Sequence, residues 1–192
     1  VNQVSSLIDD IGKSFGSLVV FSDEFKKNVK DAGTDAIALG GSLQDTIDIT
    51  KSLTSEFGLS LDEAVDLSSK VFDTSKALGL SAQEGANLFG VLMQTANLSA
   101  EQAESLAEGT FQLAAQAGVA PTAVMQDIAS SSEAVATFTK DGGDNIARAA
   151  VQARALGVSL DTSAKIAEGL LDFESSIRAE QEASVLIGRQ IN

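Results

Sequence analysis

The chain has no cysteine, no histidine, no tryptophan and no tyrosine among its 192 residues. Without Cys and His it lacks the commonest ligands of soft metals, the thiol nucleophile and the usual proton shuttle near neutral pH. Disulfides are excluded as well. Its nine aromatic residues are all Phe, so the large anchors that dominate tight interfaces and ligand pockets are scarce. We therefore expect neither an enzyme nor a bound cofactor or metal.

Proline and long apolar runs are also scarce. The single proline, Pro121, permits long uninterrupted helices. The longest apolar run, Leu18 to Phe21, is far too short to span a bilayer, so no membrane span is expected. Hydrophobic residues nevertheless make up 44% of the chain, enough for an ordered core in one or two domains. Because residue 1 is Val, we expect this sequence to be a piece of a longer chain.

Positive charge is the third deficit. The net charge is −14 and the isoelectric point is near 4.2. The one small basic group, Lys26, Lys27 and Lys30, stands among acidic residues. Phosphate recognition needs clustered Lys and Arg, so nucleic-acid binding and adsorption to anionic membranes are disfavoured. An acidic surface would repel DNA.

A short punctuation recurs along the chain. It consists of Gly or Asn, an apolar residue, Ser, and Glu or Gln three positions after the Ser. Gly and Asn tolerate the left-handed conformation that ends a helix. The Ser is a strong N-cap, and the following Glu or Gln completes a capping box. Each copy therefore predicts the end of one helix and the start of the next. The copies are Gly58, Ser60 and Glu63; Gly79, Ser81 and Glu84; Asn97, Ser99 and Gln102; Gly157 and Ser159; and Gly118 with Pro121 at the first helical position.

This punctuation predicts an all-α fold of about eight helices, joined as hairpins or a bundle, with a long first and a long last helix. The breaks lie 21, 18, 21 and 39 residues apart, so a helical repeat array is one option. Further breaks are expected at Gly33, at Gly40–Gly41 and at Gly142–Gly143. We divide the chain into an N-terminal coiled-coil helix (1–40), a hairpin region (41–140) and a C-terminal region (141–192). The expected helices are 2–30, 42–56, 60–78, 81–96, 99–117, 121–138, 144–156 and 159 to at least 191.

Two apolar stripes are candidates for contact with other copies or partners. The first helix carries one at steps near three and four, as in a coiled-coil seam, and the last helix carries another. Gly12 and Gly16 lie four apart on the first helix, where we interpret them as weak points rather than a membrane-dimer motif. The stripes are Val4, Leu7, Ile11, Phe15, Leu18, Phe25 and Val29 in the first helix, and Ile166, Leu170, Phe173, Ile177 and Val185 in the last.

No constellation of catalytic or metal-binding residues emerges. The turn 141–145 has carboxylates and Gly but lacks the closing Glu of a calcium loop, so an ordinary turn with Asp144 as N-cap explains it better. Adjacent acids such as Asp62 and Glu63 point in different directions on a helix and suit its first turn. The serines have no His partner, and the glycines form no phosphate loop.

At the breaks the chain resembles a known family. The runs Leu78-Gly79-Leu80-Ser81-Ala82-Gln83-Glu84 and Leu156-Gly157-Val158-Ser159 resemble helix starts of tail tape measure proteins from tailed bacteriophages. The resemblance extends over about residues 43–191. It implies a long α-helical virion protein in the tail lumen, made in the host cytoplasm, whose length sets tail length and which leaves when DNA is injected.

The same resemblance implies several copies, a trimer or hexamer, in contact with tail tube, hub or baseplate proteins. A rod of 192 residues would span about 290 Å, but this chain is broken about every twenty residues. We therefore expect a bundled part of such a protein, with the uninterrupted ruler elsewhere. The alternatives are a chemoreceptor-type signalling coiled coil, opposed by the breaks, and a membrane-active helical protein, opposed by the charge.

Overall fold

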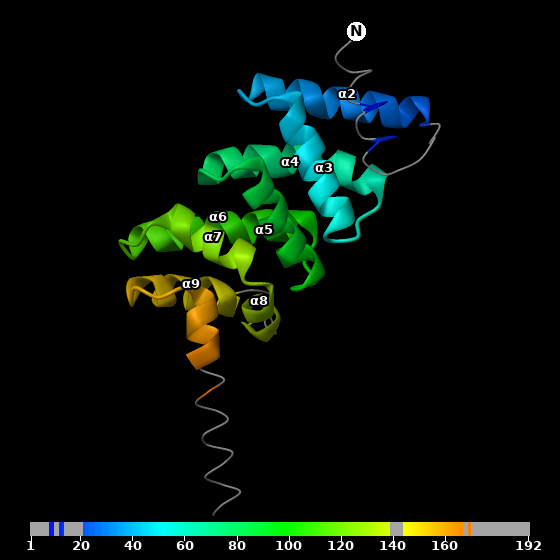
Figure 1. Ribbon diagram of the computed structural model, residues 1–192. Helices are drawn as coiled ribbons and strands as arrows, with labels where there is room; N and C mark the ends of the chain where they lie inside the picture. The colour runs from blue at the N-terminus through cyan, green and yellow to red at the C-terminus, as the bar shows by residue number, and fades with distance from the viewer. Residues whose placement is uncertain (1–7, 10–11, 14–20, 139–143, 167–168, 170–192) are drawn as a thin grey trace, which may run out of the picture.

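The computed structural model describes residues 8–9, 12–13, 21–138, 144–166 and 169, and over these residues it is helical with no strand. The predicted all-α class is confirmed. Residues 8–9, 12–13 and 160–166 are also helical. The labelled helices (Figure 1) are α2 (Asp23–Ala38), α3 (Leu43–Ser55), α4 (Leu61–Leu78), α5 (Ala82–Gln94), α6 (Ala100–Gln116), α7 (Pro121–Ser130), α8 (Ser132–Phe138) and α9 (Asp144–Ala155).

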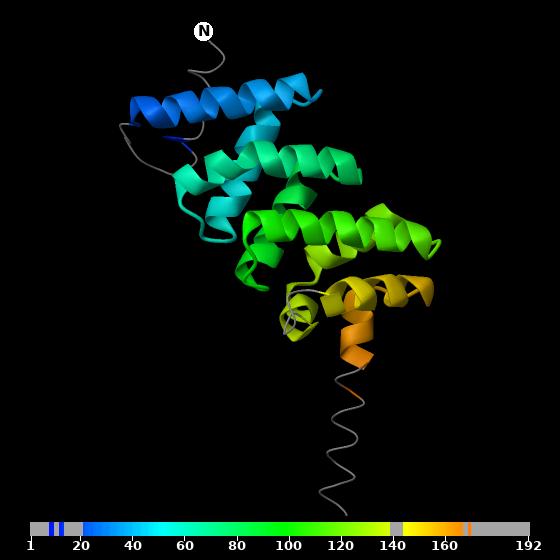
Figure 2. The same ribbon diagram turned by 180° about the vertical axis from the view of Figure 1, so that it is seen from behind.

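The helices stack in two crossed layers. In Figures 1 and 2 the first layer consists of α2, α4, α6 and α9, which lie one below another. The second layer consists of α3, α5 and α7, which cross between them. Successive helices of each layer contact one another, as do consecutive helices in the chain. Within the described ranges, no helix contacts another more than three places away along the chain. This is the contact pattern of a quasi-one-dimensional helical repeat protein.

A two-helix unit of constant length underlies the stack. Gly40, Gly79, Gly118 and Gly157 all have positive φ and follow one another at intervals of 39 residues (79 − 40, 118 − 79 and 157 − 118). Each ends a helix of the first layer. The sequence predicted single-helix units of irregular length. The structure shows that the repeat is a helix of the first layer followed by a helix of the second.

The joints at these four glycines share one hydrogen-bond pattern. At Gly79 the backbone N–H donates to the carbonyl of Lys76 at 3.2 Å, and the N–H of Leu80 donates to that of Ser75 at 2.8 Å. This is a Schellman motif, and it needs a left-handed residue. The second-layer helices α3 and α5 end in a wider turn, at Gly58 and at Asn97, which are also 39 residues apart. In both turns the N–H of the following Leu donates to the carbonyl of the residue six positions earlier. Helices of the two layers thus end in two different hydrogen-bonded turns.

Serine caps begin most of the helices. Side chain and backbone form reciprocal capping boxes at Ser42–Asp45, Ser60–Glu63, Ser81–Glu84 and Ser99–Gln102. Ser159 accepts a hydrogen bond from the N–H of Thr162 at 3.3 Å. The helix α7 starts at Pro121 after Ala120, which provides no side-chain cap. Local chemistry therefore sets where each unit starts, and Pro121 replaces the cap in one of them.

Small side chains let the layers approach closely. The residue four positions before each Schellman glycine is fully buried, and it is Ala or Ser in every unit: Ala36, Ser75, Ala114 and Ala153. Larger apolar residues, chiefly Leu53, Leu88, Phe89, Leu92 and Met125, fill the space between the second-layer helices. One apolar core follows the stack from Ala36 of α2 to Ala164.

The predicted first helix is wrong in its bounds. A joint interrupts it at Phe21 and Ser22, and Ser22 accepts a hydrogen bond from the N–H of Phe25 as the N-cap of α2. α2 then continues to Ala38, so Gly33 lies buried inside a helix instead of breaking the chain. The predicted boundary at residue 40 separates α2 from α3 and α4, and α2 contacts both.

The first apolar stripe was predicted to contact other copies or partners, and the two of its members that the structure describes do not do so. Phe25 and Val29 are buried against Ile47 and Val65 of the same chain, so they belong to an internal cluster rather than a partner surface. The other members, Val4, Leu7, Ile11, Phe15 and Leu18, lie outside the described residues. In the last helix Ile166 is exposed, whereas Leu170, Phe173, Ile177 and Val185 lie outside the described residues.

The predicted helix 121–138 is two helices. α7 stops at Ser130, and Ser131 leaves the helical region with φ −117° and ψ 56°. Ser131 is buried where the two earlier units place Leu53 and Leu92, 39 residues apart in turn. A Ser at that place loses an apolar anchor, so the helix ends early. The predicted break at Gly142 and Gly143 lies outside the described residues.

Candidate functional site

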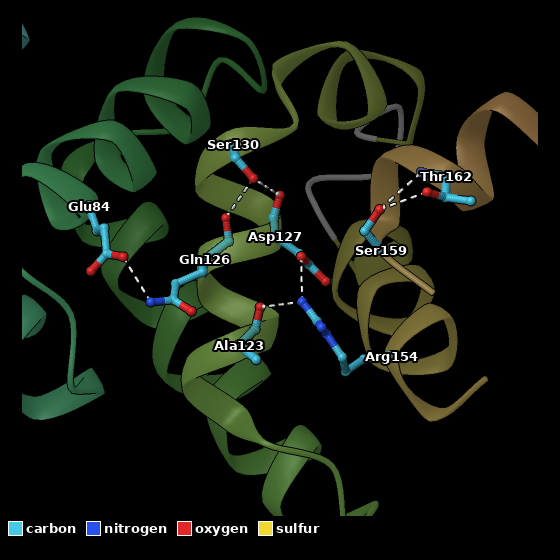
Figure 3. A network of polar contacts seen from close by, with 8 residues as sticks. All are labelled: Glu84, Ala123, Gln126, Asp127, Ser130, Arg154, Ser159 and Thr162. Carbon is cyan, nitrogen blue, oxygen red and sulfur yellow. Dashed lines mark hydrogen bonds and ion pairs between the residues drawn. The ribbon is translucent and has the colours of Figure 1, made fainter. Parts of the chain in front are cut away.

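An ion pair with one buried partner lies between α7 and α9. Asp127 of α7 forms an ion pair with Arg154 of α9, with 2.5 Å between Oδ1 and Nη2 (Figure 3). The guanidinium also donates to the backbone carbonyl of Ala123 at 3.3 Å. Asp127 is only 7% exposed, and its Oδ2 has no partner; neither has Nε of Arg154. A buried pair with unsatisfied atoms gains little over an apolar contact.

The place of Asp127 in the repeat makes this pair unusual. The equivalent residues of the two preceding units, at steps of 39, are Ile49 and Leu88, and both are fully buried. A carboxylate thus occupies an apolar position of the core. The sequence did carry a signal for it, because Gln126 and Asp127 interrupt the apolar residues from Val124 to Ala129. That signal becomes readable only once the 39-residue period is known.

A shallow groove opens between α6 and α9. Its volume is about 660 Å³. In the preceding unit, Lys70 of α4 reaches Glu104 of α6 at 2.7 Å and covers this interface. Gly109 stands at the equivalent place in α6, so no side chain fills the gap beside Arg148. The groove is lined by Leu98, Glu101, Gln102, Ser105, Leu106, Gly109, Thr110, Leu113, Ala147 and Arg148.

Hydrogen bonds between side chains join neighbouring second-layer helices. Gln83 of α5 donates to Ser52 of α3 at 3.0 Å, and Ser52 donates to Asn87 at 3.2 Å. Gln126 of α7 donates to Glu84 of α5 at 2.8 Å (Figure 3). These contacts bridge neighbouring helices of one layer, so they fix the spacing of the units.

The shifted carboxylates belong to caps and not to a reactive centre. The side-chain hydroxyl and the backbone N–H of Ser60 hold the pKa of Glu63 below its usual range. The backbone N–H of Ser81 does the same for the pKa of Glu84, with help from its hydroxyl and from Gln126. The hydrogen bond from Lys70 to Glu104 raises the pKa of the Lys70 ammonium. All three shifts favour the charged form, whereas a general acid or base needs a pKa near neutrality.

The predicted break and cap residues that the structure describes lie at helix ends along the stack. Figure 1 shows the first-layer helices running in the same direction, so their glycine ends collect at one edge of the stack. Exposed apolar side chains lie at that edge, namely Ile37, Leu39 and Leu156, the last being 81% exposed. Among the residues that the structure describes, no group of acidic side chains is arranged to hold a metal ion. No described helix is long and apolar enough to cross a bilayer.

Comparisons with protein families, with curated proteins and with solved structures found no match for this chain. What its own residues define is a two-layer helical repeat protein.

Proposed function

We propose that this chain is a structural, non-catalytic part of a tape-measure-like protein in the tail of a tailed bacteriophage. It would act as a folded helical array next to the extended ruler. The observation that carries the proposal is the recurrence of the family-like joint at Gly79 and Gly157, two units of 39 residues apart, in a stack with small buried side chains. Such an array gives length and rigidity without a ligand.

The distribution of charge supports a place beside DNA. No Lys or Arg stands between Lys76 and Lys140, while Glu84, Glu101 and Glu108 lie in that stretch. A surface without cations offers phosphates no counter-charge. Nucleic acid would pass such a surface without adhering.

The proposed partners are other copies of the chain, as a trimer or hexamer, and tail tube, hub or baseplate proteins. Apolar side chains that remain exposed in a folded protein often mark contact surfaces. The edge that carries Leu39 and Leu156 is the part of the described surface best suited to such contacts. The proposed location is the virion, with the host cytoplasm during assembly.

A signalling coiled coil is less compatible with this geometry. Such a protein needs long continuous helices with a sustained heptad seam. The longest labelled helix here, α4, has 18 residues, and the second layer crosses the first (Figure 2).

Virions provide the direct test. Quantitative mass spectrometry of purified particles from the encoding phage should detect peptides of residues 21–138 at a few copies per particle. After DNA ejection is triggered, the same peptides should leave the particle, whereas tail tube peptides stay. Absence of the chain from intact virions would refute the proposal.

A second test uses the isolated chain. Titration of a fluorescent DNA duplex at physiological salt should give no binding, because binding in this range depends on phosphate contacts. A variant in which Glu101, Glu104 and Glu108 are all changed to Lys serves as a matched control for charge. Tight binding by the unmodified chain would contradict a role beside passing DNA.

A further inference from the structure

The third repeat unit departs from the other units at the interface between α7 and α9. Its second-layer helix is the shortest of the three, with 10 residues against 13 in α3 and α5. It begins at Ala120 without a side-chain cap, and it ends at the buried Ser131. Three elements of the repeat, the cap, the apolar anchor and the full helix length, are therefore missing from one unit.

The interface between α7 and α9 has a charged residue at a position where the second-layer helices α3 and α5 have an apolar one. Asp127 replaces the aliphatic residue of the two earlier units and meets Arg154, as Figure 3 shows. Oδ2 of Asp127 and Nε of Arg154 remain without partners. Closing this interface removes the Asp127 carboxylate from water, covers part of the Arg154 side chain, which stays 33% exposed, and leaves part of their hydrogen-bonding capacity unused. Opening it restores their hydration, so opening here costs less than at an apolar interface.

The neighbouring first-layer contact, between α6 and α9, contains an open groove. Between α4 and α6 the Lys70–Glu104 pair covers the interface, but between α6 and α9 the groove at Gly109 takes its place. The first-layer contact beside the polar pair is thus also incompletely filled. The groove in one layer and the polar pair at the other therefore both involve α9.

We infer that the array is built with a hinge between α7 and α9, at which α9 with residues 160–166 rotates as a rigid body against α2–α7. The short helix α8 contacts both parts. The backbone of Ser131, already outside the helical region, gives the chain a place to absorb the rotation. Within each part the helices stay intact, because the backbone hydrogen bonds of a helix lie within it and do not cross the interface. The inference goes beyond a tail role and holds for the folded array by itself.

Distances between spin labels test this directly. The chain has no cysteine, so labels attach only where one is introduced. Labels at Gln112→Cys and Gln152→Cys measure the distance between α6 and α9, across the hinge. Labels at Asp73→Cys and Gln112→Cys measure the distance between α4 and α6 and serve as the control. All three positions are exposed. The distance distribution across the hinge should be about twice as wide as the control distribution, or wider. Equal widths would overturn the inference.

A double variant that replaces the Asp127–Arg154 pair with apolar residues tests whether this pair causes the motion. Asp127→Leu with Arg154→Ala places the Leu of the preceding unit at 127 and removes the charge at 154. The hinge distribution should narrow to the width of the control pair. The matched variant, Lys70→Ala with Glu104→Ala, removes a more exposed ion pair and should leave the hinge width unchanged. If the distance distribution across α6 and α9 stays wide in this variant, the polar pair is not the cause of the hinge. If the variant fails to fold, the comparison of the two label pairs in the otherwise unmodified chain tests the hinge.

Hydrogen exchange separates a hinge from local unfolding. Rigid rotation leaves the backbone hydrogen bonds of α9 in place, so its amides should exchange about as slowly as those of α5, within about tenfold. A wide distance distribution combined with exchange in α9 faster by about a hundredfold or more would show that the helix unfolds, and would overturn the hinge.

Discussion

Gly85 of α5 lies directly against Ser75 of α4. A Cβ atom placed on Gly85 would be 1.6 Å from the Ser75 Oγ and 2.7 Å from its Cβ. Neither atom can move far, because the Ser75 hydroxyl donates to the backbone carbonyl of Val71 within the same helix. This contact joins two helices of one unit, and it explains a Gly inside a helix where Ala would be the better helix former.

Gly85→Ala should therefore destabilise the fold by about 2 kcal/mol or more, as overpacking does in a dense core. Urea unfolding followed by circular dichroism measures the change. Gly109→Ala is the matched control, since it also sits inside a helix and a Cβ there meets nothing within 4 Å. The control should gain about 0.5 to 1 kcal/mol from helix propensity. Equal effects at both sites would show that packing at Ser75 does not matter.

The left-handed joints predict a second difference. Gly118→Ala meets no steric contact, so its loss should come from the positive φ alone, about 1 to 2 kcal/mol. Gly79→Ala should lose more, because its Cβ would also lie 3.1 Å from the hydroxyl of Thr122. Asn97→Gly keeps the φ of 54° accessible and should be neutral or slightly stabilising. Thermal melting of the three variants ranks them, and a neutral Gly118→Ala would argue against the joint.

The helix caps predict opposite effects for two substitutions. Ser99→Ala should destabilise by about 1 kcal/mol through loss of the capping box at Gln102. Ala120→Ser adds a hydroxyl at an uncapped N-terminus with extended backbone, and it should stabilise by about 0.5 to 1 kcal/mol. Chemical unfolding measures both. Loss of stability in Ala120→Ser would mean that Pro121 and its surroundings leave no room for a cap.

Stability should fall on acidification through the capping carboxylates. The folded protein holds the pKa values of Glu63 and Glu84 below the ordinary value. A lowered pKa in the folded state means that the contribution is complete above the ordinary pKa and is lost as pH falls through the folded one. The urea midpoint should thus decline below about pH 4.3. Ser81→Ala should show a smaller decline than the unmodified chain, and identical pH profiles would exclude the caps as the cause.

Local rules were sufficient for the joints at Gly58, Gly79, Asn97, Gly118 and Gly157. A left-handed residue followed by a capping Ser is complete within a few residues, so its geometry needs no distant contact. The same rules missed the break at Ser22. There the apolar steps run from Leu18 to Phe25 across the joint, and no Gly precedes the Ser. Periodicity alone cannot distinguish one long helix from two that present the same face.

The end of α7 was missed for a related reason. Ser130, Ser131 and Ser132 interrupt the sequence without Gly or Pro, and helical spacing resumes at Ala134. Only comparison with Leu53 and Leu92 shows that an anchor is absent at Ser131. The constant 39-residue period was present in the glycines throughout, but it is visible only when helices are counted in pairs.

The amino-acid sequence by itself determined the all-α class, the acidic character and the helix starts at Ser42, Ser60, Ser81, Ser99, Pro121 and Ser159, because these depend on neighbours along the chain. The tertiary structure decided that the helices form two crossed layers and that Phe25 and Val29 face inward. It also brought Asp127 and Arg154 together across 27 residues. Those outcomes depend on which faces meet across space, and no local propensity carries that information.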